Sequence, residues 1–155
     1  MEGKKDVSSK IRHWCARAER SKALVRRKLR TWGALDQAEE VIATLVEEGY
    51  LDEARFAEAY ALDHVRLKGW GPIKVASGLR YEHSIADADV ERALALLSEE
   101  DIRAAAAAAV VKRRRRHPEE PTNATVSDLL RRGFTVDVAK AAVAADVPPK
   151  FESPW

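Results

Sequence analysis

The sequence has little of what disulfide-bonded, β-rich or membrane-spanning proteins need. Its one cysteine, Cys15, excludes an intramolecular disulfide and a cysteine-rich metal site, and we expect a small buried side chain. Seven glycines and six prolines, in a chain dominated by Ala, Leu, Glu and Arg, argue against alternating strands and glycine-rich turns. The longest apolar run, residues 104–111, is far shorter than the roughly 20 residues of a bilayer span, and the charged first ten residues are not a secretory signal. We therefore expect an all-α, cytoplasmic protein.

The patterns of catalytic and metal sites are missing as well. The loop "KGWGP" matches neither the GxxxxGK[ST] nor the GxGxxG phosphate-binding pattern. Acidic pairs such as Glu39–Glu40 stand on predicted helices, where carboxylates are more often exposed ion-pair partners than an acid–base pair. We therefore predict no catalytic activity, no cofactor and no metal ion. The histidines stand far apart, none in a HExxH or similar ligand spacing: His13, His64, His83 and His117.

Charge is distributed in blocks of alternating sign. The chain has 27 basic and 25 acidic side chains and a net charge of +2. A protein that meets only a polyanion would not need the acidic blocks. The alternation indicates helices that pair through charge, or a partner that presents both signs, such as a nucleoprotein. The net charges are +8 in residues 1–33, −8 in 34–65, +3 in 66–83, −5 in 84–101, +6 in 102–116 and −2 in 117–155.

A repeat of about fifty residues organises the chain. The segments "LRTWG", "LRYEH" and "LLRRG" begin at Leu29, Leu79 and Leu129, and each ends one amphipathic helix and precedes another. Repeats of this size bury too little apolar surface to be secure alone, so we expect an elongated, curved array that offers a long surface for binding. The predicted organisation is a flexible N-terminus (1–8), three tandem three-helix repeats (9–50, 51–98 and 99–146) and a flexible C-terminal tail (147–155).

Local signals place the individual helices. Ser21 is a suitable N-cap, with Gly33 as the left-handed C-cap of the same helix. Asp52 and Thr135 are suitable N-caps in the same way, and Pro72 suits a first helical turn because its missing N–H would have no acceptor there. The predicted helices run from Ser21 to Trp32, Leu35 to Glu48, Asp52 to "KGWGP", Pro72 to Tyr81, Asp87 to Leu97, Glu99 to "HPEEP", Thr122 to Arg132 and Thr135 to Ala145.

Apolar side chains recur at helical spacing and predict the core. Phe56, Tyr60 and Leu67 lie roughly along one side of their helix. Val25, Leu29 and Trp32 share one face of theirs. The large aromatic residues that we expect in the core are Trp14, Trp32, Phe56, Tyr60 and Phe134.

Two stretches carry a family resemblance. They are "GYLDEARFAEAYALDHVRLKGWGP", residues 49–72, and "LLRRGF", residues 129–134. In these motifs and their order the sequence resembles the RecX family, bacterial regulators of the RecA recombinase, from about Trp14 to Asp146. The resemblance implies three three-helix repeats in a curved protein that binds in the groove of the RecA filament on single-stranded DNA. It also implies inhibition of filament growth, ATPase activity, strand exchange and repressor cleavage.

The sequence departs from the family pattern in two places. His83 stands where the other two repeats have glycine, and one extra residue follows before Val90, so we expect a different turn there. The "HPEEP" segment and the alanine-rich helix before it resemble the family only loosely. The implied partners are the RecA filament and its single-stranded DNA, with no membrane, and we expect a monomer.

Basic side chains on helical faces are the candidate contacts with RecA or DNA. Each phosphate contact would steepen the log–log salt dependence by about one unit. Few acidic residues stand near Lys22, Arg26, Arg27 and Arg30 in the sequence to pair with them. This favours binding of a partner at that face over a face that meets only solvent. For Arg131 and Arg132, stabilisation of a helix C-terminus is nearly as good an interpretation. The candidates are Lys22, Arg26, Arg27 and Arg30, then Arg66, Lys68, Lys74 and Arg80, then Arg113, Arg116, Arg131 and Arg132.

Trp70 is the one aromatic candidate. It stands between two glycines in a predicted loop, next to Lys68. Its ring could stack on a base, fill a pocket on a protein partner, or pack as a hydrophobic cover between helices of neighbouring repeats. The sequence does not choose between these roles.

A free-standing helical DNA-binding protein, such as a transcriptional regulator, is the alternative function. Short helices with a basic second helix superficially resemble helix-turn-helix units. Against this, the basic residues recur in all three repeats instead of marking one recognition helix. The acidic blocks between them would also repel a duplex that lay along the whole chain.

Overall fold

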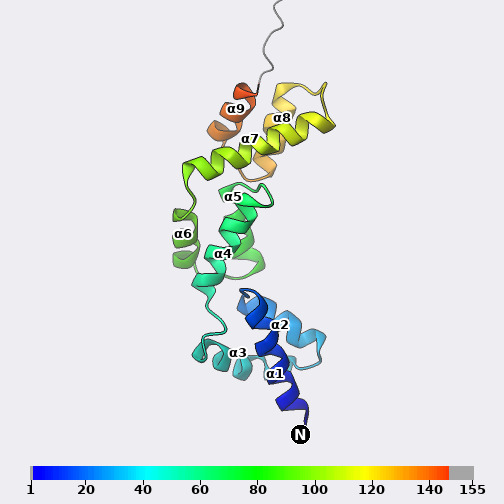
Figure 1. The fold of residues 1–155 in the computed structure, drawn as a ribbon, viewed down its shortest axis with the longest axis vertical. Helices are drawn as coiled ribbons and strands as arrows, with labels where there is room; N and C mark the ends of the chain where they lie inside the picture. Colours follow the sequence, from blue (N-terminus) through cyan, green and yellow to red (C-terminus); the bar gives the residue numbers. More distant parts are fainter. Residues whose placement is uncertain (1, 147–155) are drawn as a thin grey trace, which may run out of the picture. The chain divides into compact units, whose positions relative to one another are not determined.

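The computed structural model describes the backbone of residues 2–146 and the side chains of residues 7–146, and Figure 1 shows its elements in chain order. Within that range every regular element is helical, which confirms the all-α prediction. The elements are α1 (Glu2–Arg17), α2 (Lys22–Thr31), a 3₁₀ turn η1 (Leu35–Gln37), α3 (Ala38–Glu47), α4 (Glu53–Arg66), α5 (Pro72–Ser77), a π-helical turn η2 (Gly78–Glu82), α6 (Asp87–Ala95), α7 (Glu99–Arg116), α8 (Thr122–Arg131) and α9 (Val136–Ala145).

The α-helices therefore follow one another as three successive sets of three, as the repeat predicts. By contacts, the described residues pack into two compact units. Unit 1 holds the residues up to Leu62 together with Ala76–Leu96, and unit 2 holds Asp63–Val75 together with the residues from Leu97 onward. The repeat boundaries at residues 50 and 98 stay predictions. The expected C-terminal tail lies outside the described residues, and flexibility of residues 1–8 also stays a prediction, with α1 beginning at Glu2.

Helix starts agree with the predicted caps. The Ser21 hydroxyl accepts a hydrogen bond from the Leu24 N–H at 3.1 Å, and the Thr135 hydroxyl accepts one from Val138 at 3.4 Å. An Asp52 carboxylate oxygen accepts from the Arg55 N–H at 3.1 Å. Each bond satisfies a backbone donor that has no acceptor inside its own helix. The predicted starts of α2, α4 and α9 are confirmed.

Three details near helix ends differ from the prediction. The helix expected from Pro72 to Tyr81 is α-helical only to Ser77, after which the chain takes the π-helical geometry of η2. The helix expected from Leu35 begins instead with the 3₁₀ turn η1, and α-helical geometry starts at Ala38. The prediction was wrong for Leu67, which was placed on the same side as Phe56 and Tyr60. It is 81% exposed, because α4 ends at Arg66 and the chain turns away before Leu67 can follow that face.

The core of unit 1 joins α1, α2 and α3. Ile11, Val25, Leu29 and Leu45 are each at most 1% exposed there. Cys15 is buried among them, as predicted. Burial raises the pKa of its thiol to about 11, so the group stays protonated and unreactive near neutral pH.

The predicted aromatic core is confirmed at three of its five positions. Phe56 and Tyr60 in unit 1 and Phe134 in unit 2 are buried. Trp14 and Trp32 are only partly buried and pack against the edge of the core of unit 1. Each of these indoles therefore retains an exposed part.

The turn after η2 is one residue longer than its two counterparts. The Leu29 carbonyl accepts from the N–H of Ala34, and the Leu129 carbonyl accepts from that of Phe134, both five residues on. The corresponding Leu79 carbonyl accepts from Ile85, six residues on. The π-helical geometry of η2 accommodates the extra residue. The expected difference at His83 is thus confirmed.

His83 does not adopt the glycine conformation of the other two turns. Gly33 and Gly133 have φ of 71° and 97°, and in the longer turn this left-handed position is taken by Ser84, with φ of 52°. His83 is instead 8% exposed and packs its ring against Phe56 and Tyr60, with centroid distances of 4.8 and 5.3 Å.

The His83 side chain also ties η2 to the start of α2. Its Nδ1 lies 2.8 Å from the Ser21 hydroxyl, the same group that caps α2. Ser21 is fully buried. One hydroxyl therefore links a helix start to a turn 62 residues away in the sequence.

In unit 2 the loop before α5 interlocks with the turn after α8. The Gly71 N–H donates to the Arg132 carbonyl at 2.8 Å, and the Ile73 N–H donates to the Gly133 carbonyl at 3.0 Å. A Cβ on Gly71 would lie 2.3 Å from the carbonyl carbon of Gly133, and a Cβ on Gly133 would lie 2.4 Å from the Lys74 nitrogen. Gly71 of "KGWGP" and Gly133 of "LLRRG" thus need to be glycine because the two backbones are in contact there.

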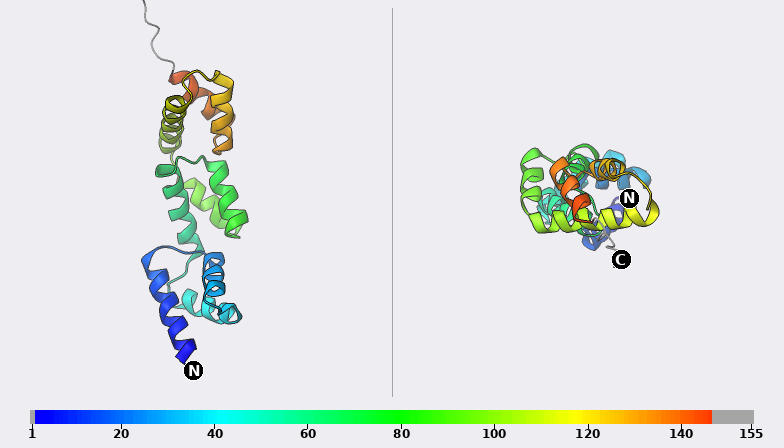
Figure 2. Two further views of the ribbon diagram at one scale, coloured as in Figure 1. Left: turned by 90° about the vertical axis from the view of Figure 1, so that its right-hand side faces the viewer. Right: turned by 90° about the horizontal axis from the view of Figure 1, so that it is seen from above.

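The helices α7, α8 and α9 pack on one another within unit 2. Figure 2 shows α7 and α9 beside α8 in both orientations. Alanine and valine side chains of α7 are buried there, including Ala106 and Val110, together with Leu129 of α8 and Val143 of α9. Small side chains let these helices approach closely, which is the packing role of the alanine run.

Candidate partner-binding surfaces

The basic face of α2 is partly neutralised by unit 1 itself. Arg26 Nε donates to a Glu39 carboxylate oxygen of α3 at 3.2 Å. Glu53 is also close, where its carboxylate accepts from the Lys22 backbone N–H at 3.4 Å, although the Lys22 ammonium forms no ion pair within the described residues. The expectation that few acids stand near this face was therefore wrong, because η1 and α3 fold back against α2. Within the described residues, Arg27 and Arg30 are exposed and form no ion pair. They are the exposed cations of this set that are free to meet a partner.

Cationic side chains lie over the two tryptophans of unit 1. The guanidinium carbon of Arg20 is 4.0 Å from the Trp14 ring centroid, and Arg20 also donates to the Trp14 carbonyl. Lys28 Nζ is 5.5 Å from both the Trp14 and Trp32 rings, and Lys10 Nζ is 5.9 Å from Trp32. Such contacts stabilise a cation against the ring face. Both indole rings are therefore used in contacts within unit 1.

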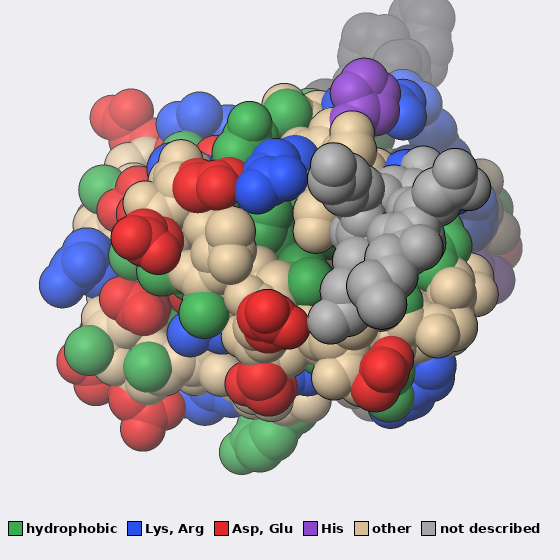
Figure 3. Space-filling view, turned by 90° about the horizontal axis from the view of Figure 1, so that it is seen from below, with side chains coloured by type: hydrophobic (Ala, Val, Ile, Leu, Met, Phe, Trp, Pro, Cys, Tyr) green, Lys and Arg blue, Asp and Glu red, His purple; other side chains and the backbone are tan. Residues whose placement is uncertain are grey.

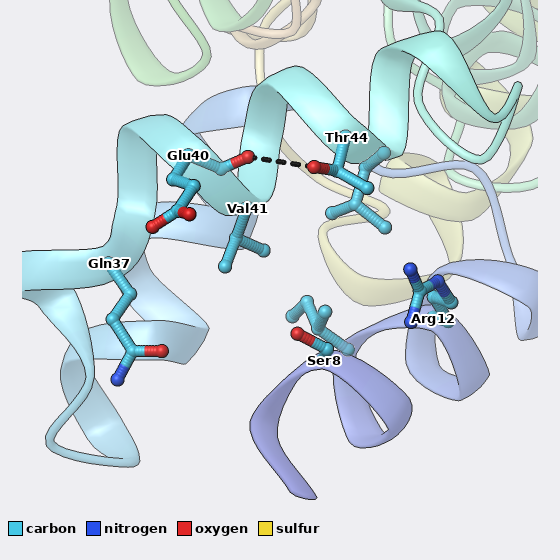
Figure 4. Close-up of a pocket in the computed structure, with 8 residues that line it drawn as sticks. Ser8, Arg12, Gln37, Glu40, Val41 and Thr44 are labelled. Carbon is cyan, nitrogen blue, oxygen red and sulfur yellow. Dashed lines mark hydrogen bonds between the residues drawn. The ribbon is translucent and has the colours of Figure 1, made fainter. Parts of the chain in front are cut away.

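An open pocket lies between α1 and α3 at the surface of unit 1 (Figure 4). The Thr44 hydroxyl in it donates to the Glu40 carbonyl of its own helix at 3.1 Å, as the dashed line shows. Arg12 reaches from α1 to both carboxylate oxygens of Glu48, at 2.7 and 2.9 Å, and this hydrogen bonding lowers the pKa of Glu48. Of these described polar groups, only the Arg12–Glu48 pair connects the two helices, and the groups do not converge on a ligand.

The candidate cations of the second repeat are not one cluster. Arg80 belongs to unit 1, where its Nε donates to Asp87 at 3.1 Å. Arg66 and Lys68 belong to unit 2, where Arg66 pairs with Asp101 of α7 at 3.1 Å. Lys68 is exposed.

The Trp70 ring contacts side chains of unit 2. Its centroid is 4.5 Å from that of His64, and Lys74 Nζ lies 4.2 Å from it. The Trp70 backbone N–H also donates to the His64 carbonyl at 2.9 Å, and Gly71, which contacts Gly133, follows directly. These contacts favour a packing role for Trp70 over base stacking.

Acidic side chains of unit 2 hold three of the predicted contact residues. Arg113 binds Glu120 through two hydrogen bonds of 2.8 and 2.9 Å. Asp128 is 9% exposed and lies 2.9 Å from Arg132, 3.7 Å from Arg113 and 3.8 Å from Arg131. Arg113 was expected to face a partner, and these bonds make it a structural residue instead.

The "HPEEP" break has a physical role in this arrangement. It ends α7 and returns Glu120 to Arg113, one turn back on that helix. The hydrogen bond from Arg113 lowers the pKa of Glu120, and the Thr125 hydroxyl donates to the same carboxylate at 2.9 Å. Arg114 is held as well, by hydrogen bonds to the Asp146 and Val143 carbonyls after and within α9. Arg116 is exposed at the end of α7.

Lys112 and Arg115 of α7 line a groove in unit 2, which we call the basic groove. It runs between the end of α4 with the turn after it and one face of α7. Sequence reasoning chose Arg113 and Arg116 and missed Lys112 and Arg115. Ala104, Ala108, Lys112 and Arg115 follow one another at intervals of four, four and three residues, which places them on one face of a helix. This spacing could have identified Lys112 and Arg115 from the sequence. Five basic side chains line the groove: Arg66, Lys68, Lys112, Arg115 and Arg132.

The described residues give no sign of metal or membrane sites. Among them, no group of three His, Cys, Asp or Glu side chains could hold a metal ion. None of the described helices has the length and apolar character to cross a bilayer.

Comparisons with known proteins find RecX proteins in each case. A family model described as RecX, second three-helix domain, matches residues 52–94. Regulatory protein RecX of Halorhodospira halophila is 33% identical over 107 residues, which cover 68% of this chain and 65% of that protein. Regulatory protein RecX of Pseudomonas syringae pv. tomato is 39% identical over 80 residues, which cover 51% of this chain and 50% of that protein. The chain thus spans between half and two thirds of the length of these relatives.

Solved structures agree in fold. A crystal structure of regulatory protein RecX matches with a TM-score of 0.76 at 19% identity, over 88% of this chain and 70% of that one. RecX from Lactobacillus salivarius matches with a TM-score of 0.69 at 21% identity, over 90% of this chain and 96% of that one. At these identities the likeness concerns the fold alone.

Proposed function

Because this chain belongs to the RecX family, we propose that it is a non-enzymatic regulator that binds the RecA filament on single-stranded DNA and inhibits it. The observation that carries the proposal is the family-model match at residues 52–94. That segment contains "KGWGP", in which the backbone of Gly71 contacts that of Gly133 within unit 2. The site of action would be the cytoplasm, where the filament forms.

Binding would use the cations that the protein leaves available. Within the described part of the chain, Arg27 and Arg30 of α2 and Lys68, Lys112 and Arg115 of unit 2 are exposed and form no ion pair. Such side chains can meet DNA phosphates or carboxylates of RecA without first losing a partner. Cations such as Arg113 would have to break a two-point hydrogen bond.

Acidic surface would meet basic surface of RecA. Figure 3 looks onto the side of unit 1 that α1 and α3 form, where acidic side chains are spread across the surface with Lys and Arg side chains among them. Glu39, Glu40 and Glu47 of α3 are exposed. A protein that contacts neighbouring RecA protomers through both signs of charge would hinder protomer addition and movement. Lower ATPase activity, strand exchange and repressor cleavage would follow without any chemistry by this chain.

The alternative is a free-standing helical DNA-binding protein. The exposed cations of α2 are the observation in its favour, since a basic second helix could enter a groove of duplex DNA. The spread of available cations over both units favours the filament regulator.

A binding comparison separates the two functions. Labelled single-stranded DNA coated with RecA and the same amount of bare duplex would be titrated with this protein at moderate salt, and bound protein measured by co-sedimentation. The regulator binds the coated strand in preference to the duplex. Preference for bare duplex would establish the DNA-binding alternative and remove the proposed function.

A further inference from the structure

The basic groove combines a strong positive charge with an apolar floor. Asp101 is the one acid among its described lining residues, and it is paired with Arg66 at 3.1 Å. Arg132 pairs outside the groove with Asp128 at 2.9 Å. Within the described residues, Lys68, Lys112 and Arg115 have no ion-pair partner, so the groove carries a net positive charge that unit 2 does not compensate.

The floor of the groove is exposed apolar surface. Ala104 and Ala108 are exposed on α7, and Val111 next to them is 41% exposed. Leu67 faces them from the turn after α4 and is 81% exposed. Alanine side chains leave room above a helix, so another chain can approach its backbone closely. Exposed apolar side chains inside a charged rim are typical of a protein interaction site.

We propose that the basic groove binds an acidic, amphipathic segment of a protein partner. Its apolar side chains would cover Leu67, Ala108 and Val111, and its carboxylates would pair with Lys112 and Arg115. The inference rests on the proposed function and deepens it, because it names the chemistry of one contact with the filament protein.

Nucleic acid fits the groove less well. A sugar–phosphate backbone would satisfy the cations but would leave Leu67 and Val111 exposed. Bases bind single-strand sites chiefly by stacking on aromatic rings, and no aromatic side chain is among the described residues that line the groove. The Trp70 ring nearby already contacts His64 and Lys74.

The test uses the full chain and a defined probe. The probe is a fluorescein-labelled amphipathic helical peptide with leucine on one face and glutamate on the other, followed by fluorescence anisotropy. A peptide with lysine in place of glutamate and a labelled oligothymidylate serve as comparison probes. The variants are the double charge reversal Lys112→Glu with Arg115→Glu, and Ala108→Trp, which fills the floor without changing charge.

The matched control reverses two charges elsewhere in unit 2. Arg103→Glu with Lys140→Glu changes exposed residues of α7 and α9 that do not line the groove. We expect the double reversal at Lys112 and Arg115 to weaken binding of the glutamate peptide by about tenfold or more. Ala108→Trp should also weaken it, while the control and the wild-type chain bind alike. Circular dichroism checks that all variants keep their helicity.

Three outcomes would overturn the inference. The first is that the wild-type chain does not bind the glutamate peptide, and the second is that both groove variants bind it normally. The third is that oligothymidylate, and not the peptide, depends on Lys112 and Arg115. Suppression of the RecA ATPase tests the proposed function separately. If the chain binds the peptide but does not suppress the ATPase, the groove proposal stands and the proposed function fails. If it suppresses the ATPase but does not bind the peptide, the proposed function stands and the groove proposal fails.

Discussion

The backbones of Gly71 and Gly133 are in contact, with an added Cβ on Gly71 placed 2.3 Å from the Gly133 carbonyl carbon. Backbone atoms cannot move aside as a flexible side chain can. We expect Gly71→Ala to lower the free energy of unfolding by about 3 kcal/mol, since even one methyl group overpacks a close backbone contact. Thermal unfolding followed by circular dichroism measures the loss.

Gly69 is the control for that substitution. It has φ of 70° but nothing within 4 Å of an added Cβ, so Gly69→Ala brings backbone strain alone. We expect a loss of about 1 kcal/mol. Equal losses at Gly69 and Gly71 would mean that the backbone contact in unit 2 is not tight.

Ser21 makes two hydrogen bonds with one hydroxyl, one as the cap of α2 and one with His83. Ser21→Ala should therefore lower the free energy of unfolding by about 2 kcal/mol. Ser98 caps α7 in the same way but is exposed there, and its capping bond to the Asp101 N–H is 3.0 Å long. Ser98→Ala should cost only about 1 kcal/mol. If chemical denaturation showed a larger loss for Ser98→Ala than for Ser21→Ala, the hydrogen bond between Ser21 and His83 would not stabilise unit 1.

The Arg113–Glu120 pair predicts a dependence of stability on pH. The hydrogen bond from Arg113 holds the pKa of Glu120 below its ordinary value of 4.5. Its stabilising effect is therefore complete above that value and is lost as the pH falls through the lower folded-state pKa. Glu120→Gln should lower the melting temperature at neutral pH, and the difference from the wild-type chain should shrink in acid.

Glu119, the exposed neighbour, is the control for this pH dependence. Glu119→Gln should leave the melting temperature nearly unchanged at both pH values. If the deficit of Glu120→Gln were the same at neutral and acidic pH, the ionised carboxylate would not be the source of the stabilisation.

Arg27 and Arg30 are exposed cations of α2 that form no ion pair within the described residues. Changing both to alanine should weaken binding to RecA-coated single-stranded DNA. The log–log salt slope should fall by about one unit for each DNA phosphate that the variant no longer neutralises. The broader change of Lys22, Arg26, Arg27 and Arg30 together to alanine should abolish suppression of the RecA ATPase and retain helicity.

Arg26→Ala alone is the matched single change, because that side chain already pairs with Glu39. It should have a smaller effect than either Arg27→Ala or Arg30→Ala. Full suppression by the four-residue variant would exclude this face of α2 from the contact with the filament.

Local features were predictable from the sequence because local chemistry decides them. Capping hydroxyls and carboxylates act within three residues, so Ser21, Asp52 and Thr135 were found correctly. The different turn at His83 was also visible, since the repeat has one residue more there. Its burial against Phe56 was not, because that contact joins distant segments.

Features that depend on long-range packing were not predictable. Arg113 faces inward because the "HPEEP" segment brings Glu120 next to it. The periodicity of α7 alone does not predict which arginine of the run takes this position. Leu67 was placed by spacing on the same side of its helix as Phe56 and Tyr60, but that helix ends one residue earlier. The acid that neutralises Arg26 comes from α3, 13 residues away.

A titration of this protein into a RecA ATPase assay on single-stranded DNA tests the central claim most directly. A regulator that binds the filament and hinders protomer addition lowers the rate of ATP hydrolysis as its concentration rises, and the four-residue α2 variant does not. An ATPase rate that stays constant throughout the titration with the wild-type chain would contradict the proposed function.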